Sequence, residues 1–265
     1  MPRTPSNDRR RRAASMFAAA LAAPVLLLAA CGDEPPAVVA TATATAEATP
    51  APTQAPTEPP TATPTPTPAV AFDPDLHRLV DKERALPEGY EPDDLVALPP
   101  EYHAPEFGGL MLREEAAAAL DDLMAAAAAE GGLDLRIRST YRSFEEQVRT
   151  FEFWVEFLGE EQARRESAVA GHSEHQLGNT VDFASEGAGW ELIEEFGETP
   201  EGRWLAEHAH EFGFAMSYPP DSEDITGYIY EPWHFRYIGV GAAAAWKEDG
   251  RPLILFLEDL AEQGE

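Results

Sequence analysis

One long segment of low complexity decides which part of this 265-residue chain can fold. From Cys31 to about Val70 the sequence consists mostly of Ala, Thr and Pro, and residues 63–68 read TPTPTP. The segment has almost no large apolar side chains, so it cannot bury enough surface to offset the conformational entropy lost on folding. Its prolines favour an extended, semi-rigid spacer. A hydrophobic core can therefore form only in residues 71–265, a length that suits one domain.

The residues before this segment have the three parts of an export signal. Arg9–Arg12 form a positive region, an apolar stretch covers Met16–Ala30, and small residues lead to Cys31. The stretch is shorter than the ~20 residues that a membrane-spanning helix needs, which favours a signal peptide. Leu28–Cys31 (LAAC) resembles the bacterial lipoprotein box, whose cysteine becomes the lipidated first residue. We therefore expect Cys31 to be lipidated.

These features predict a chain in three parts: a lipoprotein signal peptide (1–30), a lipid-anchored linker without stable structure (31–70) and a folded domain (71–265). The formal net charge is −29, and such a field repels nucleic acid and anionic lipid headgroups. We expect a monomer that lies outside the cytoplasm and contacts a membrane only through its lipid.

The folded part alternates between helical and strand patterns. Apolar spacing predicts a helix over 113–130, and Ser143 with Glu146 forms a capping-box pattern that opens another helix over 143–158. Other segments complete the pattern: strands at 133–140, 180–184, 213–218 and 233–238, and helices at 199–212, 241–247 and 252–261. Strands separated by helices without regular βαβ units predict an α+β fold, with a small, mostly antiparallel sheet flanked by helices.

Three residues have the chemistry of a metal site. His175 and Asp182 belong to the stretch SEHQLGNTVD, and His234 ends the later stretch EPWH. Two imidazoles and one carboxylate leave a fourth position for water, as catalytic zinc sites do. Nitrogen and oxygen ligands without thiolates fit Zn²⁺ outside the cytoplasm. We predict that these three side chains hold Zn²⁺ at a face of the sheet. We assign no function to the other histidines: His77, His103, His172, His208 and His210.

Glu231 precedes His234 by three residues, a spacing that a regular strand would place on opposite faces. Pro232 removes a backbone donor and keeps Glu231 extended, so it breaks the strand at this point. We therefore place Glu231 at the end of a loop and His234 at the start of the next strand. In that position Glu231 can act as a general base that takes a proton from the attacking water. The alternative is a glutamate at the rim of the site.

Arg142 lies just before the helix that Ser143 opens. A guanidinium can form two parallel hydrogen bonds with a carboxylate, so Arg142 suits a substrate with a free C-terminal acid. Without further context the residue also fits an ordinary surface arginine.

Three motifs in this order carry a family resemblance: YRSFEEQ, SEHQLGNTVD and EPWHFRY. They resemble the VanY-type zinc D-alanyl-D-alanine carboxypeptidases, which belong with the D-Ala-D-Ala dipeptidases and the L-alanyl-D-glutamate endopeptidases. With the preceding segment LVDK to DDLV, the resemblance spans Leu79–Ile238. Two departures are small: Thr140 replaces a usual glycine, and Thr180 replaces a common alanine.

The resemblance implies a role for each residue of the site. It implies zinc on His175, Asp182 and His234, with Glu231 as the base. It also implies that Arg142, Gln147 and Ser173 hold the terminal residue of a peptidoglycan stem peptide.

These implications predict a zinc carboxypeptidase that removes the C-terminal D-alanine from stem peptides and faces the cell wall. Two alternatives stay within hydrolases: LD-carboxypeptidase or endopeptidase activity on the same peptides. A non-enzyme alternative is a wall-binding lipoprotein with structural zinc, which would need a missing base or a fourth protein ligand.

Overall fold

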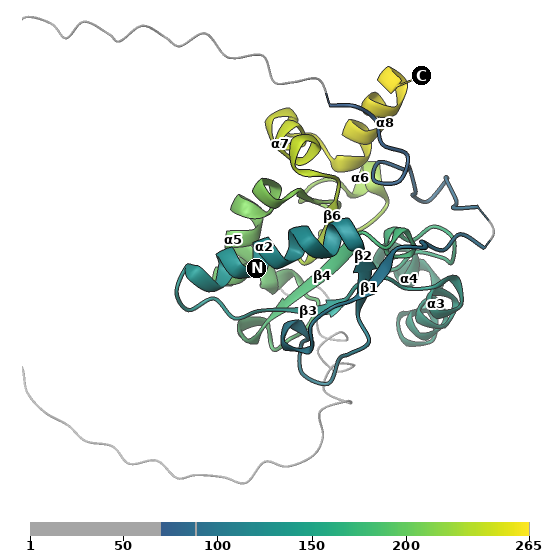
Figure 1. Ribbon diagram of the computed structural model, residues 1–265. Helices are drawn as coiled ribbons and strands as arrows, with labels where there is room; N and C mark the ends of the chain where they lie inside the picture. The colour runs from purple at the N-terminus through teal and green to yellow at the C-terminus, as the bar shows by residue number, and fades with distance from the viewer. Residues whose placement is uncertain (1–69, 88, 265) are drawn as a thin grey trace, which may run out of the picture. The chain divides into compact units, whose positions relative to one another are not determined.

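The computed structural model describes residues 70–87 and 89–264. The predicted signal peptide, the linker and Cys31 lie outside the described residues. A four-stranded antiparallel sheet runs through the fold in the order β3-β4-β6-β5, so β4 and β6 are its central strands (Figure 1). Its strands are β3 (Leu135–Ser139), β4 (Thr180–Ser185), β5 (Phe214–Met216) and β6 (His234–Tyr237). A separate antiparallel pair joins β1 (Leu95–Ala97) to β2 (Met111–Arg113).

The two faces of the larger sheet differ because side chains alternate along a strand. In β4, Val181 and Phe183 belong to the main hydrophobic core, as Phe235 does in β6. The alternate residues of both strands point to the opposite face. They are polar: Thr180, Asp182, His234 and Arg236. One face of the sheet therefore builds the core, and the other carries the polar residues of the motifs.

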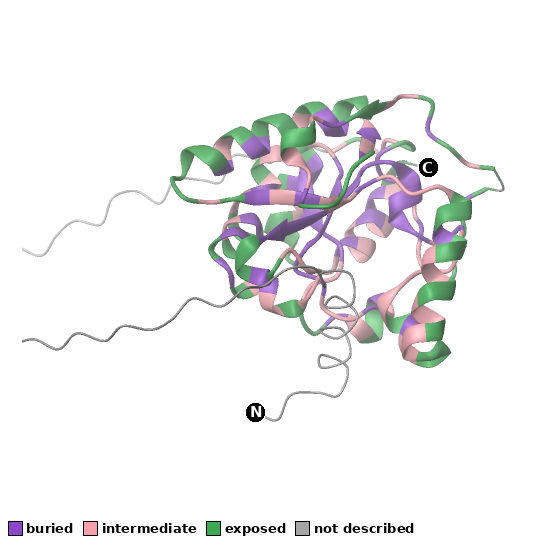
Figure 2. Ribbon diagram, turned by 90° about the horizontal axis from the view of Figure 1, so that it is seen from below, coloured by how far each residue is buried: buried purple, intermediate pink, exposed green. Residues whose placement is uncertain are grey.

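Helices supply the rest of the core. α2 (Glu114–Ala129) buries Leu120 and Leu123 against the apolar face of the sheet. A second cluster joins β5 to two C-terminal helices, α7 (Val240–Asp249) and α8 (Leu253–Gly264). Figure 2 shows the buried strands between helices whose outer faces are exposed. These contacts confirm the α+β prediction. In the described part of the chain, we find no helix with both the length and the apolar composition to span a membrane.

The predicted helix starts are confirmed at the level of single hydrogen bonds. α3 (Phe144–Leu158) begins with a complete capping box: Ser143 Oγ accepts from the backbone N–H of Glu146 at 3.2 Å, and Glu146 Oε2 accepts from that of Ser143 at 3.0 Å. α5 (Pro200–His208) is capped by Thr199, whose hydroxyl oxygen accepts from Gly202 N at 3.0 Å.

Differences from the predicted elements are confined to short segments. The helix predicted to reach residue 212 becomes a 3₁₀ turn after His208. β1, β2, α4 (Glu160–Glu166) and α6 (Glu223–Thr226) were not predicted: each has three to seven residues, and none shows a clear period in the sequence. α3 and α4 lie beside each other at one edge of the molecule (Figure 1).

The segment before β1 is tied to the sheet through His77, a residue to which the sequence assigned no function. His77 is only 3% exposed. Its Nδ1 accepts from the backbone N–H of Asp73 at 2.9 Å, and its Nε2 lies 2.9 Å from the carbonyl oxygen of Ile238. The accepting role of Nδ1 leaves Nε2 as the nitrogen that carries hydrogen. This lead-in segment (residues 73–80) therefore packs against the end of β6.

Candidate metal centre

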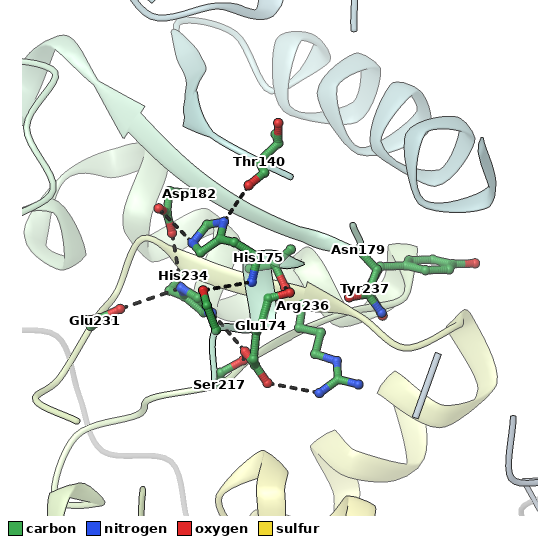
Figure 3. A network of polar contacts seen from close by, with 12 residues as sticks. Thr140, Glu174, His175, Asn179, Asp182, Ser217, Glu231, His234, Arg236 and Tyr237 are labelled. Atoms are coloured by element: carbon green, nitrogen blue, oxygen red, sulfur yellow. Dashed lines mark hydrogen bonds and ion pairs between the residues drawn. The ribbon is translucent and has the colours of Figure 1, made fainter. Parts of the chain in front are cut away.

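The three predicted metal ligands meet on the polar face of the sheet (Figure 3). Asp182 in β4 is paired directly with His234 in β6. His175 lies in a 3₁₀ turn (Glu174–Leu177) that ends at Gly178, whose φ of 77° returns the chain toward β4. All three side chains are buried, and one ligand atom from each lies within 4.8 Å of the others.

In each imidazole one nitrogen makes a hydrogen bond to a neighbouring oxygen, and the other nitrogen faces Asp182. Nδ1 of His175 donates to the carbonyl oxygen of Thr140 at 2.7 Å, while its Nε2 lies 3.1 Å from Asp182 Oδ2. Nε2 of His234 donates to Glu174 Oε2 at 2.9 Å, while its Nδ1 lies 3.2 Å from Asp182 Oδ1. When both imidazoles are neutral, as metal binding requires, these partners place hydrogen on Nδ1 of His175 and on Nε2 of His234. Nε2 of His175 and Nδ1 of His234 are then the nitrogens that can bind a metal.

The donor set fits a divalent metal. Two imidazole nitrogens and one carboxylate converge in a buried space, which is the three-residue set of a catalytic zinc site. Oδ1 of Asp182 is buried and lies 3.2 Å from Nδ1 of His234. When that imidazole is neutral, its Nδ1 carries no hydrogen, so this oxygen has no hydrogen-bond donor among the described residues. A buried carboxylate oxygen in that condition is costly, and a cation would satisfy it.

Without a metal, charges inside the site move the pKa values in opposite directions. Burial would raise the pKa of Asp182, but His175 and His234 hold it well below its usual value. Burial lowers the pKa of His234, but the carboxylates of Asp182 and Glu174 outweigh it and raise the pKa to about 10. Burial lowers the pKa of His175. Asp182 is therefore anionic at neutral pH, as a metal ligand must be.

Glu231 lies where the sequence placed it, at the end of a loop. Its backbone N–H donates to the carbonyl oxygen of Tyr218 at 3.0 Å, and its own carbonyl accepts from His234 N at 3.1 Å, which closes a turn over Pro232. The turn brings Oε2 of Glu231 to 3.6 Å from Nδ1 of His234, the nitrogen that faces the metal position. The predicted break in the strand is thus confirmed.

Arg142 is half-buried at the same site. Its backbone N–H donates to the carbonyl oxygen of His175 at 3.2 Å. Burial lowers the pKa of the guanidinium, and the negative charges of Asp182 and Glu231 raise it. Nε of Arg142 is buried and has no hydrogen-bond partner in the described part of the chain. A donor in this position can bind an anionic group of a substrate.

The other two predicted substrate contacts have structural partners. Nε2 of Gln147 donates to the carbonyl oxygen of Ala168 at 2.6 Å and lies 3.3 Å from Ser167 Oγ, so it ties α3 to the loop that follows α4. Its Oε1 is buried without a partner among the described residues. Ser173 Oγ accepts from His175 N at 3.3 Å and begins the turn that carries the ligand. Their roles in substrate binding stay predictions.

Sequence reasoning missed the group behind His234. Glu174 bonds this imidazole, and Arg236 and Ser217 bond Glu174 (Figure 3). One signal was present: Arg236 follows His234 by two residues in a strand, so it shares a face with the ligand and needs a buried anion. Ser217 and the Thr140 carbonyl had no comparable signal.

The histidines that were assigned no function lie outside the metal group. His172 Nδ1 lies 2.6 Å from the carbonyl oxygen of Asp81, and His208 Nδ1 lies 2.8 Å from Glu211.

The chain is similar to known proteins in sequence and in fold. A family model described as VanY, D-alanyl-D-alanine carboxypeptidase, matches residues 109–240. The chain is similar to YodJ of Bacillus subtilis (strain 168), with 41% identity over 181 residues that cover 68% of this chain and 66% of YodJ. The chain spans between 37% and 66% of the length of three curated relatives that it matches.

Two solved structures extend the likeness to three dimensions. The LD-carboxypeptidase LdcB is 41% identical with a TM-score of 0.63, over 68% of this chain and 84% of that one. A mutant of the vancomycin-resistance D,D-pentapeptidase VanY, in complex with Zn(II), is 31% identical with a TM-score of 0.58, over 69% of this chain and 99% of that one.

Proposed function

We propose, from the premise that the chain belongs to the VanY family, that it is a zinc-dependent carboxypeptidase acting on the stem peptides of peptidoglycan. The observation that carries the proposal is the arrangement at the polar sheet face. His175, Asp182 and His234 converge there, and Glu231 lies beside them. The relative of known structure that holds Zn(II) supports zinc as the metal.

Each residue of the centre has a distinct part in the proposed reaction. Zn²⁺ on the three ligands would polarise the scissile carbonyl and lower the pKa of a water molecule. Glu231 accepts a proton from the attacking water and passes it to the departing amine. Arg142 directs a positive charge at the site, where it orients the terminal carboxylate or stabilises the oxyanion.

A structural role for the metal is a weaker explanation. Such a site is closed by four protein ligands, whereas the group found in the described residues has three. It also has no need of the carboxylate that Glu231 supplies beside the ligand His234.

For the substrate, we propose a stem peptide that ends in D-Ala-D-Ala, from which the terminal D-alanine is removed. The family model and relatives named D-alanyl-D-alanine carboxypeptidases, from Enterococcus faecium and Enterococcus faecalis, support this choice. LD-carboxypeptidase activity on a shorter stem is the second candidate. The higher identity to LdcB than to the VanY structure favours it.

For the location, we propose an extracytoplasmic protein anchored through a lipid on Cys31. The support is in the sequence: a basic and apolar leader ends at LAAC, and an Ala/Thr/Pro-rich tether of about forty residues follows. A tether of that composition would let the domain reach wall peptides above the membrane.

The decisive experiment incubates the purified protein with pentapeptide and tetrapeptide stems, with and without a chelator, and measures released D-alanine. We expect release from the pentapeptide that stops with chelator and returns with added zinc. Release only from the tetrapeptide would establish the LD alternative. Release that ignores the chelator, or no release from either peptide, would contradict the proposed activity.

A further inference from the structure

The ligand His234 is held from behind by a buried carboxylate to which neither the motifs nor the proposed reaction gives a role. Glu174 Oε2 accepts the Nε2 hydrogen of His234 at 2.9 Å, on the side of the ring away from Asp182. Both side chains are almost completely excluded from solvent. Because His234 lies in β6 and Glu174 in the turn that carries His175, this contact joins the two elements that supply the imidazoles.

Two further contacts fix the orientation of that carboxylate, and a third holds the backbone of Glu174. Ser217 Oγ donates to Glu174 Oε2 at 2.5 Å, and Arg236 Nη1 donates to Glu174 Oε1 at 3.0 Å. The hydroxyl of Thr180 donates to the backbone carbonyl of Glu174 at 3.2 Å. The carboxylate therefore cannot turn away from His234 without breaking other buried hydrogen bonds.

Arg236 is itself anchored, which makes the support rigid. The side chain is completely buried. Its Nη2 donates to the backbone carbonyls of Leu76 and Arg78, both at 2.8 Å. These carbonyls belong to the lead-in segment, which His77 holds against the end of β6. A chain of contacts thus runs from the lead-in segment through Arg236 and Glu174 to the ligand His234.

From these contacts we propose that Glu174 is a positioning residue of the metal centre, which holds His234 with Nδ1 toward the metal. The proposal rests on the zinc site of the proposed function and adds a residue to it. A carboxylate behind a ligating imidazole fixes the tautomer and the ring orientation, and loss of such a partner typically weakens metal binding by about 10- to 100-fold.

A competing explanation is that Glu174 only neutralises Arg236. Both explanations predict a less stable protein when Glu174 is changed. They differ in the affinity of the folded protein for zinc, because only a positioning role connects Glu174 to Nδ1 of His234. The test must therefore measure zinc binding and folding separately.

The test compares the full-length protein with Glu174→Gln and Ser217→Ala. The first removes the negative charge at constant size, and the second leaves Glu174 in place but removes one of its donors. Glu201→Gln is the matched control, because Glu201 is also buried and accepts from a backbone N–H, that of Asp134 at 3.1 Å, but belongs to α5. The zinc dissociation constant is measured by competition with a chromophoric chelator, and thermal unfolding of the metal-free proteins is measured in parallel.

We expect zinc to dissociate about 10- to 100-fold more readily from Glu174→Gln. Ser217→Ala should shift the constant in the same direction by less, and Glu201→Gln should leave it unchanged.

A folded Glu174→Gln protein with the zinc affinity of the unchanged protein would overturn the proposal. If that variant does not fold, an unchanged constant for Ser217→Ala has the same effect. The measurement uses zinc alone and no peptide, so it is independent of the peptidase assay. A protein that releases no D-alanine but shows the expected zinc shifts would contradict only the proposed function.

Discussion

Among single residues, Glu231 should be needed for the reaction rate but not for zinc binding, unlike the three proposed metal ligands. It lies 3.6 Å from the metal-facing nitrogen of His234 but is outside the group that converges on the metal. We expect Glu231→Gln to keep its zinc and lose at least ~100-fold in kcat, because a positioned base contributes about that much. D-alanine release and elemental analysis measure the two quantities.

The exposed Glu160 of α4 provides the control for this change, since Glu160→Gln removes the same charge from a side chain that pairs with Arg164 on the surface. Its rate should equal that of the unchanged protein. An active Glu231→Gln protein would remove Glu231 from the mechanism, and loss of zinc would make it a ligand.

The fold lowers the pKa of the Lys82 amine, a change that chemical labelling can measure. Its Nζ lies 3.4 Å from the centre of the Tyr228 ring and donates to the carbonyl oxygen of Arg164. Burial lowers its pKa from 10.5 to about 8. The Lys82 amine therefore loses its proton at a lower pH in the folded state than in the unfolded state. Its contribution to the free energy of unfolding rises as the pH increases from about 8 to 10.5.

We therefore expect acylation of Lys82 to increase with pH around a midpoint near 8 in the folded protein. Peptide mapping by mass spectrometry separates Lys82 from Lys247, the only other lysine. Denatured protein is the control, where the midpoint should return toward 10.5. The same midpoint in both states would show that the fold leaves this amine unperturbed.

At the scale of elements, Gly178 determines how the turn that carries His175 joins β4. Its φ is 77°, and a Cβ there would lie 2.9 Å from Pro92 Cγ and 3.0 Å from Leu95 Cδ2. Its carbonyl also accepts from Arg113 N at 2.8 Å. The position needs both left-handed backbone and free space, and only glycine provides both.

Gly131 is the comparison position, because it has the left-handed backbone but not the close neighbours. Its φ is 71°, but a Cβ there would meet no atom within 4 Å. We expect Gly131→Ala to cost about 1–2 kcal/mol from backbone strain alone. Gly178→Ala should cost a further 1–3 kcal/mol or so from overpacking, and should weaken zinc binding because His175 shifts. Urea unfolding and zinc titration of both variants test this, and equal losses of stability would contradict it.

The helices show which local sequence signals are sufficient to predict where a helix begins. The capping box at Ser143 and the cap at Thr199 formed as predicted, because each needs only residues three apart in the chain. The end of α5 was not predicted, since the change to a 3₁₀ turn at Ala209 depends on packing against α2 and α7.

For the whole molecule, the metal should stabilise the fold as well as the reaction. Its ligands come from β4, β6 and the turn before β4, so unfolding must separate them. Zinc at a free concentration ~1,000 times its dissociation constant should stabilise the native state by about 4 kcal/mol.

Thermal unfolding with zinc, with chelator and with zinc restored measures this effect. We expect the midpoint to fall with chelator and to recover with zinc. His234→Ala is the control, because a protein without this ligand should unfold at one temperature in all three conditions. A midpoint of the unchanged protein that ignores chelator would contradict a metal held by these three residues.

The fold class, the strands that carry Asp182 and His234, and the three side chains that converge in the candidate metal site could all be predicted from the sequence. Alternating apolar residues and local caps depend on neighbours in the chain, and the spacing of histidines and carboxylates restricts the metal chemistry. Even the break between Glu231 and His234 followed from Pro232.

The support of these three side chains depends on contacts that form only in the folded protein. The Thr140 carbonyl behind His175, and Glu174 with Ser217 and Arg236 behind His234, come from separate elements. Their contacts depend on strand register and on the lead-in segment that packs under β6. No local pattern encodes such distances, because residues far apart in the chain meet only when the whole core has formed.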